Sequence, residues 1–321
     1  MKILNAVLVR FLVGLITLCG VAIVIFTALR AMPASFEDIV LGPISTPEAR
    51  AVVAKRFGLD RPAAEQFVLW FAAVVQGDFG ISLVTQSPVA KEIARRAPAT
   101  IQLTLMSTAL ALIIGLPLGT LSGLPNSSRL IRATGRVVGA VGASVPNFVI
   151  GSAFVYIFSV WPLGLKVGGY VPFIEDPAIN LRTMTLPTVT LAIFGIALIL
   201  RTTRDSVQRV LTEGHIATVV ASGQTPAQIV RRHVLRNASI PIFTVSATYM
   251  GYLLGGAVII EVLFSVPGIG LYTFNALQNR DYAVVQAGVL LAATVFVTIN
   301  TLSDIIYVIL DPRIAAARER Q

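Results

Sequence analysis

Few residues in this sequence could perform chemistry, and their spacing matches no catalytic or metal-binding pattern. The chain has two histidines, His215 and His233, and a single cysteine, Cys19. Neither histidine lies in an HExxH motif and no second cysteine is available, so the pattern does not favour metal binding or a disulfide. The GxxxxGK[ST] phosphate loop and the GxSxG nucleophile elbow are also absent from the sequence. We therefore expect no catalytic, cofactor-binding or metal-binding residues on this chain, and no enzyme activity.

Two acidic residues, Glu261 and Asp304, lie within or near long apolar segments. Ionisable groups inside a membrane are costly and usually face a partner or a water-filled path. For both residues capping or pairing is the preferred interpretation over proton relay, and Glu261 is also a candidate for the translocation pathway or its gate. The sequence FSVPGIG follows Glu261 and predicts a turn, which would place its carboxylate at the membrane interface, where the cost is small.

The longest polar segment within the apolar part of the chain is residues 215–239, HIATVVASGQTPAQIVRRHVLRNAS. Its first part predicts a short helix from His215 to Gly223, with Glu213 near the positive end of the helix dipole and the glycine ending the helix. A second helix is expected to start at Thr225. A helix of about nine residues is marginal in water by itself, so the first helix needs a partner surface.

The apolar residues of this predicted helix indicate what that partner surface is. Ile216, Val219 and Val220 follow the i, i+3, i+4 spacing and predict an exposed apolar face that fits a groove on another protein. The alternative is a helix lying on the lipid surface. The absence of Lys and Arg from the helix argues against that alternative.

Composition places these features in a membrane protein. Hydrophobic residues make up 55% of the chain and charged residues only 13%, against about 25% in a soluble domain. A membrane-spanning helix needs about 20 apolar residues. The run from Phe11 to Leu29 exceeds the apolar core of a signal peptide, so we expect it to be retained. Six spans are predicted, at about 8–31, 99–123, 137–162, 184–203, 241–262 and 284–310.

The net charge of +9 is distributed unevenly between the predicted loops. Residues 32–98, 163–183 and 263–283 each carry equal numbers of acids and bases, whereas residues 129–136 and 201–240 are basic. Lys and Arg are retained in cytoplasmic loops. The pattern therefore predicts cytoplasmic termini and three outer loops, and it explains the positive charge without nucleic acid as a partner.

Two further regions indicate local structure. In the long loop, Thr46-Pro47-Glu48 predicts the start of a helix that Gly58 closes, and residues 62–76 predict an amphipathic helix that serves either as a cap or as a docking surface for an external partner. Proline and glycine inside the spans predict kinks and close helix packing. Among these, Pro146 and Asn147 are candidates for the translocation pathway or a gate.

Ordered sequence blocks along nearly the whole chain resemble the permease subunits of binding-protein-dependent ABC importers, in the dipeptide and oligopeptide branch. The most specific block is GGAVIIEVLFSVPGIG (255–270). The other blocks are LGPISTPE, FGLDRP, QGDFGISL, RAPATIQLTL, ASVPNF, ASGQTPAQIVRRHVLRNASIPI, NRDYAVVQ and ILDPRI.

The resemblance implies an all-α integral membrane protein with the type I importer fold, in which a cytoplasmic coupling helix contacts an ATPase subunit. The implied coupling residues are His215, Ile216, Ala217, Thr218, Val219, Ala221 and Gly223. Many relatives have basic residues where this chain has Ala217, Val220 and Ser222, and alanine where it has Val219. Near the first span, residues 33–36 (PASF) replace the PGDP of the relatives.

The implied organisation is a first span with a periplasmic helical loop (1–98), a five-helix core (99–310) with the coupling loop at about 205–240, and a cytoplasmic tail (311–321). The implied partners in the bacterial inner membrane are a second permease, two ATPase subunits that hold ATP and Mg, and a substrate-binding protein. The implied cargo is a peptide or a related small solute. A stand-alone secondary transporter or channel is the main alternative, and a membrane-anchored sensor is a third class.

Overall fold

The computed structural model describes the chain except for residues 1, 32–40, 42–45, 57–59 and 311–321. Gly58, the PASF segment and the predicted tail lie outside the described residues. The helices are α1 Lys2–Arg30, α3 Pro47–Arg56, α4 Ala63–Val75, α5 Val89–Gly123, α6 Arg129–Ser144, α7 Asn147–Val160, α8 Pro177–Leu211, α9 Gly214–Ala221, α10 Pro226–Ile229, the π-helix η1 Val230–Val234, α11 Leu235–Gly256, α12 Val258–Leu263, α13 Ile269–Gln278 and α14 Tyr282–Leu310.

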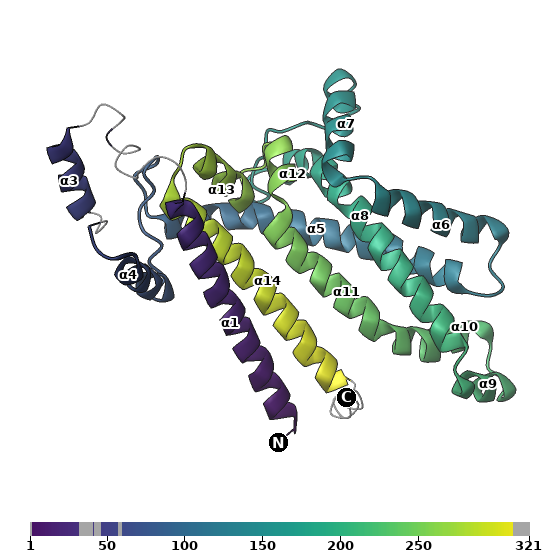
Figure 1. The fold of residues 1–321 in the computed structure, drawn as a ribbon. Coiled ribbons are helices and arrows are strands. Elements are labelled where there is room, and N and C mark those ends of the chain that lie inside the picture. The colour runs from purple at the N-terminus through teal and green to yellow at the C-terminus, as the bar shows by residue number, and fades with distance from the viewer. Residues whose placement is uncertain (1, 32–40, 42–45, 57–59, 311–321) are drawn as a thin grey trace.

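The long helices α1, α14, α11 and α8 lie in a row, and α5 crosses this row (Figure 1). Helices α9 and α10 lie at one end of these long helices, and α12 and α13 lie at the other end (Figure 1). We call these the α9 end and the α13 end. The N-terminal end of α1 and the C-terminal end of α14 point to the same side of the molecule as α9 (Figure 1).

Four of the described helices, α1, α5, α8 and α14, are long and apolar enough to cross a membrane. Each overlaps one of the predicted spans, so the chain is a multi-pass membrane protein. The predicted span at 241–262 is divided between α11 and α12, and it is not among the four. Six spans therefore remain a prediction.

The third predicted span, 137–162, is wrong as a single helix. The structure divides it into α6 and α7, which meet at an angle of 94°. Pro146 lacks an amide hydrogen and restricts the preceding residue, and Val145 is accordingly extended, with φ −96° and ψ 122°. Helix α7 restarts directly after the proline.

The core is formed where α5 packs against α8, and glycine makes the close approach possible. A Cβ atom on Gly119 would lie 2.7 Å from the carbonyl oxygen of Leu200, and one on Gly115 would lie 3.1 Å from that of Ile196. Fully buried side chains such as Leu103 fill the remaining space. Small residues bring helices together in membranes, where van der Waals packing replaces the hydrophobic effect.

Helix α1 is held on α14 by close packing and by an ion pair. A Cβ atom on Gly14 would lie 2.9 Å from Val297 Cγ1. The guanidinium of Arg10 forms a salt bridge with the carboxylate of Asp304. The pairing of Asp304 agrees with the structural interpretation that the sequence analysis preferred.

Reversing one charge of this pair is expected to loosen α1. In Asp304→Arg two guanidinium groups would lie together, and we expect a loss of about 1–2 kcal/mol in the free energy of unfolding. The double exchange, Arg10→Asp with Asp304→Arg, should recover most of that loss. Thermal unfolding of the purified protein measures both. Equal loss in the single and double variants would show that the salt bridge contributes nothing.

The long loop after α1 contains both predicted helices. Helix α3 begins at Pro47, and the Thr46 hydroxyl oxygen accepts a hydrogen bond from the Ala49 amide at 3.3 Å. Helix α4 covers the second predicted segment almost completely. The helix-start signals in this loop are confirmed.

Candidate functional site

Helix α9 forms where the sequence predicts a short helix after the long span α8. It ends one residue before Ser222, and Gly223 follows with φ +78°, a left-handed conformation that glycine adopts without strain. Glu213 occupies the N-cap position without a capping hydrogen bond. Its carboxylate instead lies 3.2 Å from Nδ1 of His215.

One predicted feature of this helix is wrong: Ile216 is not part of an exposed face. Its side chain is only 5% exposed and packs with Val207 and Val210 at the end of α8 and with Val234 of η1. Val219, which is partly buried, packs against the same cluster. The sequence could not separate burial against this chain from burial against a partner, because either contact requires the same apolar spacing.

The opposite side of α9 is exposed and presents small side chains. Ala217, Thr218, Val220 and Ala221 are all exposed, as is Gly223 after the helix. Small residues let another backbone come close, and the absence of Lys and Arg makes the surface largely uncharged. Helix α9 therefore has one side anchored on this chain and one side free. We call the free side the α9 surface.

The segment after α9 connects it to α11 and is held by side-chain hydrogen bonds. Thr225 begins α10 with a reciprocal capping box, in which its hydroxyl and the Gln228 side chain each bond the other's backbone amide. The Gln224 Oε1 atom lies 3.2 Å from Nε2 of His233. The next five residues form the π-helix η1, which runs directly into α11. The helix restart at Thr225 was predicted, whereas the π-helix was not.

The break between α6 and α7 lines a cavity of about 290 Å³. Pro146 and Asn147, predicted to line a pathway or gate, both lie in its wall. Phe194 of α8 and Tyr252 of α11 also line this cavity. Irregular backbone inside a membrane is found where it is buried in protein or borders a cavity. Phe194 and Tyr252 were not predicted to line a cavity. Each lies in a helix that is apolar on all sides at that point, so the sequence does not show which side faces the cavity.

Glu261 does not line that cavity, although its neighbours Ile259 and Ile260 do. Its side chain is fully buried and lacks the contact with water that was expected from a position at the membrane interface. Its carboxylate accepts hydrogen bonds from the Thr100 hydroxyl at 2.6 Å and from the Leu271 amide at 2.9 Å. Thr100 Oγ1 in turn accepts from the Ile269 amide at 2.9 Å. Both amides belong to the first turn of α13, so Glu261 and Thr100 together cap this helix from two other helices.

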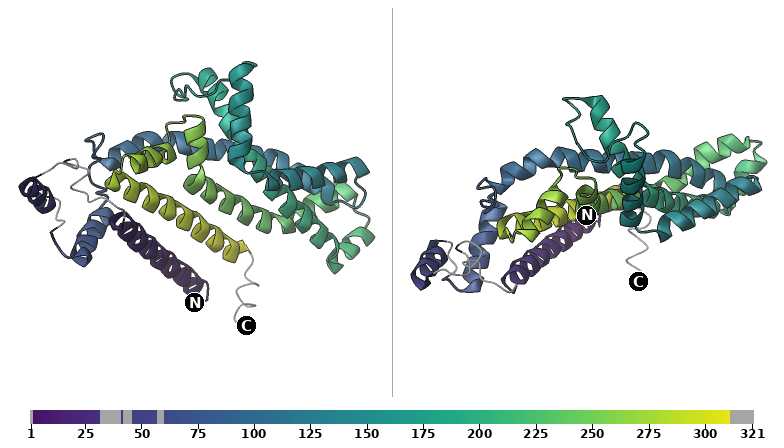
Figure 2. Two further views of the ribbon diagram at one scale, coloured as in Figure 1. Left: turned by 45° about the horizontal axis from the view of Figure 1, so that its top comes forward. Right: turned by 90° about the horizontal axis from the view of Figure 1, so that it is seen from above.

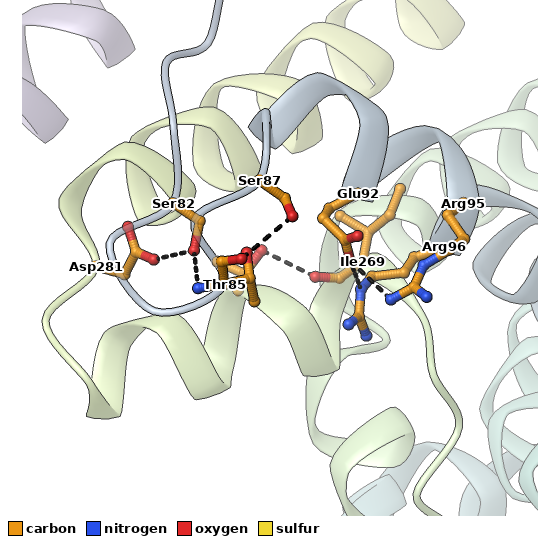
Figure 3. Close-up of polar contacts among 9 residues, drawn as sticks. Ser82, Thr85, Ser87, Glu92, Arg95, Arg96, Ile269 and Asp281 are labelled. Carbon is orange, nitrogen blue, oxygen red and sulfur yellow. Dashed lines mark hydrogen bonds and ion pairs between the residues drawn. The ribbon is translucent and has the colours of Figure 1, made fainter.

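A second polar cluster at the α13 end joins the loop before α5 to the corner before α14 (Figure 3). The carboxylate of Asp281, only 1% exposed, accepts a hydrogen bond from the Ser82 hydroxyl at 2.6 Å. The Ser82 oxygen also accepts from the Thr85 amide at 3.0 Å. Nearby, Glu92 pairs with Arg95 and Arg96 on the first turns of α5 (Figure 3). Ser82 and Asp281 lie in two of the quoted sequence blocks, but their contact could not be predicted from sequence.

Comparison with known families agrees with this architecture. Residues 115–316 match the family described as "Binding-protein-dependent transport system inner membrane component", and residues 3–104 match the N-terminal family of the same membrane components. The chain belongs to this family of inner-membrane transport components, as the sequence blocks indicated.

Individual relatives match over nearly their whole length. The "Probable peptide ABC transporter permease protein y4tP" of Sinorhizobium fredii is 36% identical, with 96% of this chain and 98% of the relative covered. The "Dipeptide transport system permease protein DppB" of Alkalihalophilus pseudofirmus is 34% identical, with 95% and 97% covered. The "Glutathione transport system permease protein GsiC" of Salmonella choleraesuis is also 34% identical, with 97% and 99% covered.

A solved structure shares the fold. The inward-facing MetNI methionine ABC transporter has a chain that superposes with a TM-score of 0.56 at 19% identity, covering 68% of this chain and 96% of its own length. Over that part of the chain, the fold is thus shared with a chain of an ABC transporter.

Proposed function

We propose that this chain forms half of a translocation pathway in an ATP-driven importer, with a second permease as the other half. The observation that carries the proposal is helix α9, which is anchored through Ile216 and leaves a small, uncharged surface free. Since the chain has no phosphate-binding loop, ATP and Mg would be held by separate ATPase subunits that dock on the α9 surface.

The anchoring of α9 gives this docking a mechanical consequence. Ile216 packs on the end of α8 and on η1, which continues into α11. The same two long helices supply Phe194 and Tyr252 to the cavity wall. When ATP binding brings two ATPase subunits together, a displacement of α9 would move both helices and rock the pathway between inward-open and outward-open states. ATP hydrolysis would then reset the cycle.

The charge pattern and the positions of the helix ends support one orientation in the membrane. Lys and Arg concentrate in the loop that contains α9, and the ends of α1 and α14 point to the same side (Figure 1). We place both termini and α9 in the cytoplasm. Six spans, counting α11 with α12 and α6 with α7 as one each, leave α3, α4 and the α13 end on the outer side, where a substrate-binding protein would dock.

The proposed cargo is a peptide or a peptide-like small solute. Three relatives of this chain are named for peptide, dipeptide and glutathione transport. The cavity wall offers aromatic side chains and irregular backbone, which suit a solute that combines apolar side chains with amide groups. Uptake of labelled dipeptides, longer peptides and glutathione into cells with and without this permease would distinguish these cargoes.

The coupling role can be tested by replacing Gly223 with valine. A β-branched residue at φ +78° costs about 1–2 kcal/mol and would distort the end of α9, although the site itself has open space around it. We expect the complex to assemble in the membrane while ATP-dependent uptake falls by about tenfold, the factor that corresponds to about 1.4 kcal/mol.

The matched control is Gly214→Ala at the other end of α9. No neighbouring atom lies within 4 Å of the added Cβ, and the backbone does not have a positive φ. Uptake by this control should be close to that of the unchanged protein. Normal uptake by Gly223→Val would contradict the coupling role, and transport by the chain purified without any ATPase would favour a stand-alone transporter.

A further inference from the structure

Helix α4, which was predicted to be amphipathic, is instead apolar on nearly every side, and this is unusual for a helix in a loop. Among its 13 residues, AAEQFVLWFAAVV, only Glu65 is charged and only Gln66 is otherwise polar, and none of the 13 is buried. A helix that is hydrophobic all round normally lies in a protein core or in a membrane. Contact with one neighbour therefore cannot account for the whole surface of α4.

One stripe of α4 packs against the C-terminal part of α1. The ring centroid of Phe26 lies 5.2 Å from that of Phe67 and 5.7 Å from that of Trp70. The opposite stripe has no such cover among the described residues: Val68 is 63% exposed, Leu69 50% and Val75 71%. This second stripe, defined by these three residues, is the free face of α4.

The contacts with α1 fix the level of α4 along that helix. Phe26 lies one turn before Arg30, about 6 Å deeper along the helix axis. Figures 1 and 2 show α4 beside the C-terminal part of α1 and not beyond its end. The polar side chains lie next to these rings: the Arg30 guanidinium lies 3.5 Å from the centroid of the Phe26 ring and bonds the Gln66 side-chain oxygen, and Arg61 pairs with Glu65 at 2.9 Å.

We propose that α4 lies in the outer lipid interface, with its free face covered by acyl chains. Helix α1 is a candidate span, and its residues just below Phe26, Ile23 and Val24, are 50% and 65% exposed, as residues that contact lipid are. The free face of α4 continues that lipid-facing surface. Arg30 and the Arg61–Glu65 pair supply polar groups beside the aromatic rings, and Trp70 occupies the position that tryptophan favours at membrane interfaces.

A substrate-binding protein is the competing occupant of this face, and the side chains argue against it. A protein interface that forms and separates contains polar groups and hydrogen bonds. Beyond Glu65, which lies one turn before Val68 and Leu69 and is paired with Arg61, the free face of α4 has only aliphatic side chains. Lipid covers such a surface without leaving a polar group unpaired.

Tryptophan fluorescence can test the proposal, because the chain has only two tryptophans, Trp70 and Trp161. The probe is Leu69→Trp in the full-length chain with both native tryptophans changed to phenylalanine, reconstituted in nanodiscs of phospholipids brominated at defined acyl carbons. Ile16→Trp, at a 71% exposed position of α1, is the lipid reference, and Ala227→Trp on α10 is the water reference.

We expect brominated lipid to quench the Leu69→Trp probe as strongly as the lipid reference, most effectively with bromines ~5–10 Å below the headgroups. Aqueous iodide should quench only the water reference. The Trp161→Phe variant, which leaves α4 unchanged, should give the same shallow quenching through Trp70. Quenching of Leu69→Trp by iodide and not by brominated lipid would overturn the proposal. Protection from iodide only after a substrate-binding protein is added would assign the free face to that protein.

Discussion

Replacing Gly268 with alanine is expected to disrupt helix α13 and abolish transport. The added Cβ would lie 2.4 Å from the carboxylate of Glu261, which is fully buried and bonded to Thr100 and Leu271. Gly268 has φ −88°, which any residue adopts, so the effect would come from the clash and not from backbone strain. We expect a loss of about 3 kcal/mol or more, measured by thermal unfolding of the purified permease, with loss of uptake in cells.

Variants of Glu261 separate its capping role from the clash. Glu261→Ala leaves the Leu271 amide and the Thr100 hydroxyl without their acceptor, at a cost of about 1–3 kcal/mol for each buried group. Glu261→Gln keeps an acceptor oxygen and should lose less. The matched control for Gly268→Ala is Gly255→Ala. Its added Cβ would lie 3.9 Å from the nearest atoms, so this variant should be almost as stable as the unchanged protein. A Gln variant as unstable as the Ala variant would indicate that the charge itself is required.

Replacing Gly119 with leucine is expected to prevent α5 from packing on α8. Its Cβ would lie 2.7 Å from the backbone carbonyl oxygen of Leu200 and 2.7 Å from the Cβ of Thr203. Backbone atoms inside a helix cannot move aside as a flexible side chain does, so the two helices would have to separate along the core. We expect a loss of more than about 3 kcal/mol, and little folded protein in the membrane. The amount of monodisperse protein after detergent extraction measures this loss.

Gly20 provides the matched control for the α5–α8 contact. It also lies inside a membrane-spanning helix, α1, but no heavy atom of the described structure lies within 4 Å of an added Cβ. Gly20→Leu makes the same change at an exposed position and should leave the yield of folded protein unchanged. If Gly20→Leu and Gly119→Leu reduced that yield equally, the loss would reflect helix insertion and not packing between α5 and α8.

The membrane class of the protein and the position of α9 could be predicted from sequence, because each depends on local properties. The apolar runs that became α1, α5, α8 and α14 are long and continuous, and hydropathy alone identifies such segments. Gly223 ends α9 through its own backbone freedom, and Thr225 starts α10 through a bond to a residue three positions away. The sequence blocks likewise identified the family.

Contacts between distant residues could not be predicted in the same way. Glu261 meets Thr100 across 161 positions of the chain, and Asp281 meets Ser82 across 199. An acidic residue beside an apolar run is compatible with an interface, a pathway or a buried cap. Which of these is formed depends on the groups that the fold places around the carboxylate.

Ile216 shows most directly what could not be predicted from the sequence. The sequence determined that one side of α9 is apolar and must be covered, because a short helix is unstable in water without a partner. It could not determine what covers that side, since periodicity records only the direction in which apolar side chains point. Only the tertiary structure placed Ile216 against the ends of α8 and η1, leaving the opposite side of α9 free. The same reason applies to the break at Pro146: proline predicted a disturbance of the helix, and the packing of α8 and α11 around it decided that a cavity formed there.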